Sequence, residues 1–217
     1  MATGGFSTRD ASIGYYDSLK VEAIIIIFMF IGGINFTLIW FILAREFVKA
    51  YKDEEFKTYL VYILVAVSVM MVALVTTNVN LGDSFRQSLF QTISIGTSTG
   101  YTTQDYMTWP AVTQFILMIL MIVGACAGST SGGLKLMRII LAFKVAMREL
   151  VRIAQPRKIK QIRMNGGVVE PQQIDKIVGM LFVWIGLFGI ASILLSVLMF
   201  DESFESIIGI TASSLVI

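Results

Sequence analysis

Long apolar runs separated by short charged stretches constrain the fold of this chain more than any other feature. The runs cover about residues 21–44, 58–79, 109–124 and 174–200. A helix of about 20 residues is long enough to cross the hydrocarbon core of a bilayer. Hydrophobic residues make up 56% of the chain and charged residues 15%, against about 45–50% and 25% in soluble domains. The sequence therefore predicts an all-α membrane protein in contact with the lipid bilayer.

A shorter segment lies between the second and third runs. Leu81–Phe85 is predicted to form a turn with a helix N-cap, and Phe85–Ile95 a helix that is too short to span. The glycine- and threonine-rich residues 96–103 follow it, and they favour neither a helix nor an ordinary strand. A short helix followed by an extended segment between two spans predicts a re-entrant loop.

The basic residues predict the orientation. Residues 45–57 and 138–163 carry most of the Lys and Arg, whereas residues 80–110 and 201–205 carry almost none apart from Arg86. Because Lys and Arg gather in cytoplasmic loops, the basic loops are expected to face the cytoplasm and the Gly/Thr loops the outside. The basic stretch 138–163 favours lipid headgroups or a cytoplasmic subunit as its neighbour. We expect no nucleic-acid partner.

The chain also repeats itself. Residues 3–10 align with residues 98–105, which places Gly5 on Gly100, and residues 83–85 align with 202–204. Two apolar runs separate the members of each pair, so the chain returns to the same side of the membrane and the repeats are parallel. Parallel units of span, short helix, glycine loop and span predict a pore around a central axis.

The glycine loops carry the atoms for cation binding. Irregular backbone at membrane depth must be buried in protein or line a water-filled cavity, where its carbonyl oxygens can replace the hydration shell of an ion. Oxygen donors suit an alkali ion, and the C-terminal end of the short helix adds a partial negative charge. An ordinary extracellular loop remains an alternative. The candidate ion-binding residues are Thr3, Gly4, Gly5, Phe6, Ser98, Thr99, Gly100 and Tyr101.

The third apolar run is interrupted by a second glycine-rich segment, which we interpret as a gate loop. It resembles a phosphate-binding loop only superficially, because Leu134 precedes Lys135 and Leu136 stands where Ser or Thr is required. Packing of small residues between helices, with Gly124 and Gly128 four apart, is an open alternative. The candidate gate residues are Ala125, Cys126, Ala127, Gly128, Ser129, Thr130, Ser131, Gly132, Gly133 and Lys135.

Three segments together resemble the Trk/Ktr/HKT superfamily of potassium transporters, and most closely its bacterial Trk membrane subunit: residues 3–13, 98–103 and 124–135. The resemblance implies potassium-channel-like repeats around a pseudo-fourfold pore axis. Residues 1–57 would be the end of repeat two, 58–165 repeat three, and 166–217 the start of repeat four. Because the other filters would lie outside this sequence, we expect these residues alone not to conduct.

The same resemblance implies potassium uptake across the bacterial inner membrane, with the potassium ion as transported ligand and no covalently bound cofactor. It also implies a homodimer and a cytoplasmic nucleotide-binding regulatory subunit. A sodium-coupled or poorly selective cation transporter of the same fold is the alternative, although glycine at position 100 favours potassium within the family. An enzyme is disfavoured, since the chain has no histidine and no recognisable nucleophile with its base. A membrane scaffold would not need irregular backbone at membrane depth.

Overall fold

The computed structural model describes residues 4–155, 161–199 and 203–216, and these are mainly helical. The prediction of an all-α architecture is confirmed, with one two-stranded antiparallel hairpin added to it. The elements are the helices α1 (Leu19–Gly32), α2 (Phe36–Leu43), α3 (Phe47–Lys52), α4 (Glu54–Val75), α5 (Leu81–Gly96), α6 (Ala111–Val123), α7 (Leu136–Ala154), α8 (Pro171–Leu198) and α9 (Phe204–Val216), the short 3-10 turns Ser12–Tyr16 and Tyr106–Thr108, and the strands β1 (Arg163–Met164) and β2 (Gly167–Val168).

Two helices, α4 and α8, are each long and apolar enough to cross a membrane, with 22 and 28 residues. They match the predicted runs 58–79 and 174–200, with boundaries shifted by a few residues toward the N-terminus. Helix α4 begins early because the Asp53 side chain accepts a hydrogen bond from the Phe56 N–H (2.8 Å) and caps it.

The apolar run over residues 21–44, which is long enough for one span, is not one continuous helix. The run forms α1 and α2, which are bent by 105° relative to each other. The Asn35 side chain caps α2 by accepting from the Thr37 N–H (2.9 Å). The preceding glycine pair, Gly32 and Gly33, ends α1, and its carbonyl groups bond to a distant part of the chain, as shown below.

The short helix predicted over residues 85–95 is present as α5, but it begins at Leu81, so the predicted turn over residues 81–85 is wrong. The Ser84 hydroxyl bonds back to the Val79 carbonyl (3.3 Å) and does not cap a later helix start. The third run is interrupted as predicted, since α6 ends at Val123 and α7 begins at Leu136.

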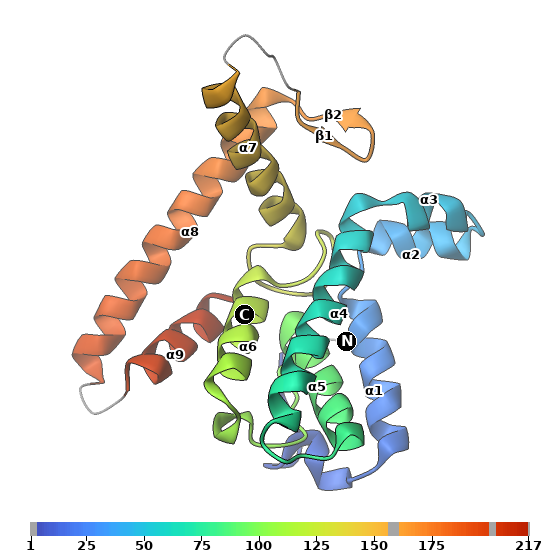
Figure 1. Ribbon diagram of the computed structural model, residues 1–217, viewed down its shortest axis with the longest axis vertical. Helices are drawn as coiled ribbons and strands as arrows, with labels where there is room; N and C mark the ends of the chain where they lie inside the picture. Colours follow the sequence, from blue (N-terminus) through green and yellow to red (C-terminus); the bar gives the residue numbers. More distant parts are fainter. Residues whose placement is uncertain (1–3, 156–160, 200–202, 217) are drawn as a thin grey trace.

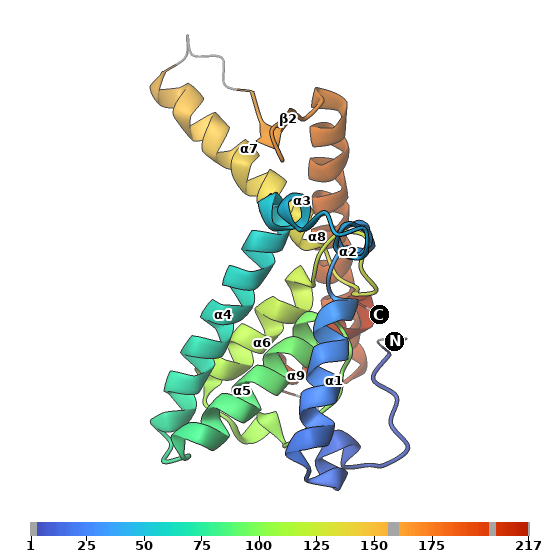
Figure 2. The same ribbon diagram turned by 90° about the vertical axis from the view of Figure 1, so that its right-hand side faces the viewer.

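Helices α1, α4, α5 and α6 lie side by side, and α5 sits among the others (Figures 1 and 2). One core cluster includes Met29, Tyr59, Phe90 and Cys126. A second packs α4, α5 and α6 together around Met70 and Leu120. Helix α8 runs apart from this bundle and contacts α7 near one end and α9 near the other (Figure 1). The bundle therefore fixes α5 and the loop that follows it.

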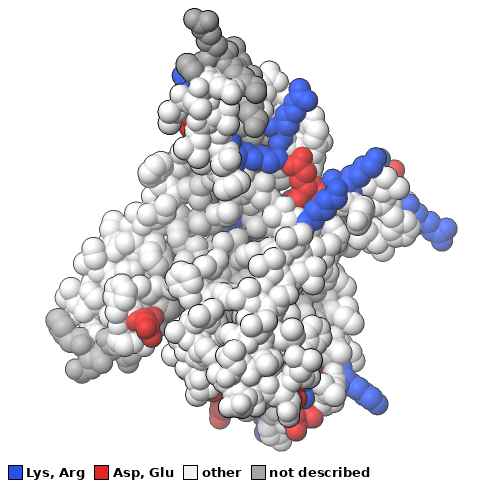
Figure 3. Space-filling view, viewed as in Figure 1, with Lys and Arg blue, Asp and Glu red and all other residues white. Residues whose placement is uncertain are grey.

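The charges separate along the long axis of the molecule. Most of the Lys and Arg atoms visible in Figure 3 lie at its upper end, around α7 and α3, whereas the middle of that face is almost free of charge. Many large apolar side chains of α4 and α8 in this middle zone are exposed, including Leu64, Val72, Phe182 and Leu194. This distribution matches a membrane-embedded zone with a basic side.

Candidate functional site

Helix α5 positions the segment Ser98–Tyr101 through its last turns. The N–H groups of Thr99 and Gly100 donate to the Ser94 carbonyl (2.8 and 3.3 Å), and the Ser94 hydroxyl donates to the Tyr101 carbonyl (2.7 Å). The hydroxyls of Thr97 and Thr99 lie 2.8 Å apart, and both side chains are buried. The last turns of the short helix thus hold the following segment from behind, with the hydroxyl groups of Ser94 and Thr97 both hydrogen-bonded.

The two glycine loops that the repeat aligns lie next to each other. Gly5 and Gly100 both have positive φ (69° and 77°), and a methyl group placed on Gly100 would lie 3.1 Å from the Cα of Gly5. Just beyond them, the N–H groups of Ile13 and Gly14 donate to the Thr102 carbonyl (3.1 and 3.2 Å). Positive φ and close approach of two backbones are both conditions that favour glycine.

The carbonyl groups of this pair of loops are available to a ligand. Within residues 4–155, 161–199 and 203–216, no protein group donates a hydrogen bond to the carbonyls of residues 4–6 or 98–100. Gly5 and Gly100 are exposed, and the side chain of Phe6 is 89% exposed. Thr3, which the sequence places in the same group, lies outside the described residues. Free backbone oxygens can coordinate an alkali cation. No group of three or more His, Cys, Asp or Glu that could hold a metal ion occurs among the described residues.

The second glycine-rich segment, which we call the gate loop (residues 125–133), docks onto the break between α1 and α2. It is not helical, so the alternative of small-residue packing between helices at Gly124 and Gly128 is wrong. The docking consists of three backbone hydrogen bonds: Cys126 N–H to the Gly33 carbonyl (3.1 Å), Thr130 N–H to the Gly32 carbonyl (3.2 Å), and Phe36 N–H to the Gly128 carbonyl (3.1 Å). The break and the loop therefore satisfy each other's backbone groups.

The gate loop also contacts the segment that follows α5. The hydroxyls of Ser98 and Ser131 lie 3.1 Å apart, and the Gly132 N–H donates to the Ser98 hydroxyl (3.1 Å). Ser131 is 4% exposed, and its hydroxyl also accepts from the Ala125 N–H (3.1 Å). Ser98 and Ser131 thus connect the candidate ion-binding residues to the candidate gate residues.

The gate loop and the residues next to it make tight turns at several glycines and at Lys135. Gly124, Gly128 and Gly133 all have positive φ. At Gly132 a methyl group would collide with the Val216 carbonyl oxygen at the end of α9. The Lys135 ammonium group donates to the carbonyls of Ser129 (3.3 Å) and Ser131. The loop therefore uses its polar groups within the protein.

An ion pair that sequence reasoning missed joins α1 to α5. Glu22 is 3% exposed, and its two oxygens accept from Nε and Nη2 of Arg86, both at 2.6 Å. Asp17 lies 3.5 Å from the same guanidinium. The sequence did hold a signal: Glu22 is a lone charge in the first apolar run, and Arg86 is the exception among the weakly basic loops. Both exceptions are explained because the two residues form an ion pair with each other.

A second missed residue, Glu55, lies at the start of α4 and is also 3% exposed. Its Oε1 accepts from the N–H groups of Ala127 (2.6 Å) and Met137 (3.1 Å). Ala127 belongs to the gate loop and Met137 to the first turn of α7. In the sequence Glu55 is one of three consecutive acidic residues in a charged stretch, where nothing marks it as buried.

Comparisons with known proteins agree on one family. The model of the TrkH family, described as "Cation transport protein", matches residues 1–212. The Trk system potassium uptake protein TrkH of Vibrio parahaemolyticus is 36% identical over 184 residues, covering 82% of this chain and 38% of that protein. The Escherichia coli K12 protein of the same name is 36% identical over 182 residues, with the same coverage.

A solved structure shares the fold. The crystal structure of the potassium transporter TrkH from Vibrio parahaemolyticus superposes with a TM-score of 0.89 at 34% identity, covering 99% of this chain and 47% of that chain. This chain therefore spans less than half the length of the relatives that it matches.

Proposed function

Because this chain belongs to the TrkH family of cation transport proteins, we propose that it forms part of a path for potassium uptake across a membrane. The observation that carries the proposal is the pairing of two glycine loops. Gly5 and Gly100 lie in contact, both at positive φ, beside carbonyl groups that receive no hydrogen bond from the described protein groups. Related proteins are named for potassium uptake.

In this proposal the residues 4–6 and 98–101 are two segments of a selectivity filter. Each presents backbone oxygens in place of the ion's hydration shell. The α5 helix points its C-terminal end, which carries partial negative charge, toward the same place (Figure 2). Ser94 and Thr97 hold the segment from behind, so that the spacing of the oxygens is fixed by the protein and not by the ion.

The gate loop would obstruct the path at the inner end of the filter. Ser98 is the filter residue nearest to α5, and it is the one that bonds to the loop. A loop rich in glycine and serine, anchored by single hydrogen bonds, can leave such a position without unfolding a helix. Movement of residues 125–133 away from Ser98 would open the path.

The basic side of the molecule is proposed to face the cytoplasm of a bacterial cell, with the filter toward the outside. The basic residues around α7 and α3 (Figure 3) and the bacterial origin of the relatives support this orientation. The homodimer and the nucleotide-binding regulatory subunit stay predictions from the family resemblance. The basic face of α7 is where a cytoplasmic subunit would bind.

Uptake of labelled ions into proteoliposomes tests the proposal. We would place this chain into the Vibrio parahaemolyticus relative in place of its aligned residues and measure rubidium and sodium uptake against the unchanged relative. The proposal predicts rubidium uptake that excess sodium does not suppress. Equal uptake of the two ions would favour the poorly selective alternative, and rubidium uptake that requires sodium would favour the sodium-coupled one. An inactive chimaera beside an active parent would contradict the proposal.

A further inference from the structure

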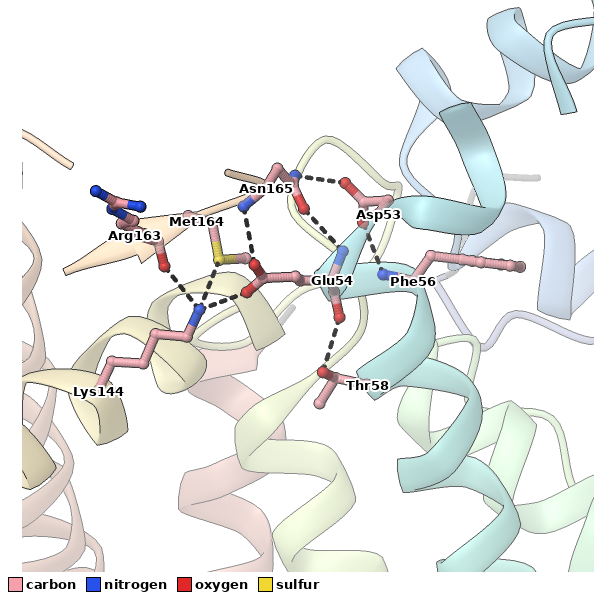
Figure 4. Close-up of polar contacts among 8 residues, drawn as sticks. All are labelled: Asp53, Glu54, Phe56, Thr58, Lys144, Arg163, Met164 and Asn165. Carbon is pink, nitrogen blue, oxygen red and sulfur yellow. Dashed lines mark hydrogen bonds and ion pairs between the residues drawn. The ribbon is translucent and has the colours of Figure 1, made fainter. Parts of the chain in front are cut away.

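Three consecutive acidic residues at the start of α4 contact three different segments of the chain. Asp53, Glu54 and Glu55 share one helical turn, but their carboxylates point in different directions (Figure 4 shows the first two). Acidic residues suit a helix N-terminus because of the helix dipole. The helix dipole does not, however, account for the specific hydrogen-bond donors that each carboxylate has here.

Glu55 points into the protein, toward the gate loop. Its Oε1 accepts from Ala127 N–H at 2.6 Å and from Met137 N–H at 3.1 Å, and the residue is 3% exposed. The two donors stand on either side of the tight turn that contains Lys135. Hydrogen bonds to a charged acceptor are stronger than those between neutral groups. One buried carboxylate therefore fixes both the gate loop and the beginning of α7.

Glu54 contacts the middle of α7, and Asp53 and Glu54 together hold the turn of the β1–β2 hairpin (Figure 4). Glu54 accepts from the Lys144 ammonium group on α7 and from the Asn165 N–H (3.2 Å), and its own N–H donates to the Asn165 side chain (2.8 Å). The Asn165 amide donates to Asp53 (2.7 Å). Lys144 also donates to the Arg163 carbonyl of β1 (2.8 Å). The start of α4 is thus a junction of loop, helix and hairpin.

We propose that Glu55 is a positioning residue of the gate, which holds the loop against Ser98 while Glu54 holds the helix that follows. This inference rests on the proposed function, because it assigns a cause to the closed position of the proposed gate. Besides its backbone hydrogen bonds to the break between α1 and α2, the loop is held by Ser98 at the filter and by Glu55 at α4. Weakening the second contact should release the loop without touching the filter.

The substitution Glu55→Gln tests the proposal because it keeps the shape of the side chain and removes its charge. In the chimaera described above we expect about a tenfold rise in the open fraction, and so in rubidium uptake, which corresponds to about 1.4 kcal/mol. The ratio of rubidium to sodium uptake should not change. A substitution that merely damaged the fold would lower uptake, so the direction of the effect separates the two roles.

A second readout uses Cys126, which is the one cysteine of this chain, is fully buried and lies beside Ala127. With the cysteines of the relative replaced, its modification by a methanethiosulfonate reagent reports on loop position without any ion flow. Glu55→Gln should speed the modification by a similar factor. Glu46→Gln is the matched control, because Glu46 is a partly exposed acid whose one ion pair among the described residues is with Lys49, three residues along the chain, and it should change neither readout.

Unchanged or reduced uptake together with unchanged Cys126 modification in folded Glu55→Gln would overturn the proposal. If that variant does not fold, Lys144→Met takes its place, since Lys144 is partly exposed and its loss should give about a threefold faster modification; no change there would also overturn it. A chimaera without rubidium uptake in which Glu55→Gln still speeds Cys126 modification would contradict the proposed function and leave this inference standing.

Discussion

The filter residues 98–101 and the gate loop 125–133 both interrupt helices with glycine and hydroxyl side chains, yet their backbone groups have different surroundings. In the filter the N–H groups of Thr99 and Gly100 point back to Ser94, and the carbonyls of Ser98, Thr99 and Gly100 receive no donor from the described residues. In the gate loop most N–H groups and most carbonyls have hydrogen-bond partners, in α1, α2, Glu55, Ser98, Lys135 and neighbouring turns.

We propose that this difference separates an ion-binding segment from a segment that obstructs the path. A segment whose carbonyl oxygens are free, and which a helix holds in place, can coordinate a cation. A segment whose carbonyl oxygens already accept hydrogen bonds does not need one. A segment whose polar groups bond to the protein can form a stable obstruction that moves when those bonds are exchanged. In this proposal, segments of similar glycine-rich composition serve two functions, and their hydrogen-bond partners decide which.

The largest effect should come from the ion pair behind the filter. Arg86→Gln leaves the Glu22 carboxylate buried without its bidentate partner, and we expect a loss of about 3 kcal/mol in stability because an uncompensated buried charge is costly. Thermal denaturation of the purified chimaera measures it. The modification rate of Cys126 should stay unchanged below the melting temperature, since the pair contacts α1 and α5 but not the gate loop.

The double variant Glu22→Gln/Arg86→Gln is the control for this prediction and should recover most of the lost stability. Lys49→Gln, which breaks an exposed pair, should have almost no effect. A melting temperature for Arg86→Gln equal to that of the unchanged chimaera would show that the pair does not position α5.

A smaller effect is expected where the gate loop meets α9. Gly132→Ala makes a methyl group collide with the Val216 carbonyl oxygen, so α9 or the loop must shift, at a cost of about 1–3 kcal/mol. We expect a lower melting temperature and faster Cys126 modification. Gly209→Ala in α9 is the matched control, because nothing lies within 4 Å of its added methyl group. Equal behaviour of the two variants would contradict the observed packing of loop and helix.

The smallest effect should come from the contact between the two segments. Ser98→Ala removes the hydroxyl that accepts from the Gly132 N–H and pairs with Ser131. One such hydrogen bond contributes about 1 kcal/mol, so the open fraction should rise about fivefold. Rubidium uptake measures the change. A drop in uptake with intact folding would mean that Ser98 serves ion binding more than it serves closure.

Much of this arrangement could be predicted from the sequence, because apolar runs and repeats are local properties. The apolar runs placed α4 and α8 within a few residues, and the repeat paired Gly5 with Gly100, which the structure brings into contact. The bend between α1 and α2 was missed, although Gly32, Gly33 and Asn35 are turn-forming residues. Its cause is the docking of the gate loop, whose residues lie far away in the sequence.

The sequence also could not predict which single charged residues are buried. Glu55 and Glu54 are neighbours of the same type, but one is buried under the gate loop and the other is partly exposed beside Lys144. Only their partners distinguish them: residues 127 and 137 for Glu55, and residues 144 and 165 for Glu54. Sequence patterns therefore located the segments that carry the proposed function, whereas the contacts that position them came from the fold.

The selectivity of Gly100→Ser tests the central claim, that Gly5 and Gly100 line one ion path. At φ 77° and 3.1 Å from the Cα of Gly5, a side chain at position 100 must disturb both loops. Gly166→Ser is the control, since Gly166 has a similar φ of 80° in the β1–β2 turn and open space around it. We predict that Gly100→Ser lowers the rubidium-to-sodium uptake ratio of the chimaera about tenfold or more, as expected when oxygens of the binding site shift, whereas Gly166→Ser leaves it unchanged. An unchanged ratio in folded Gly100→Ser would mean that position 100 does not line the path, and the assignment of the filter would be wrong.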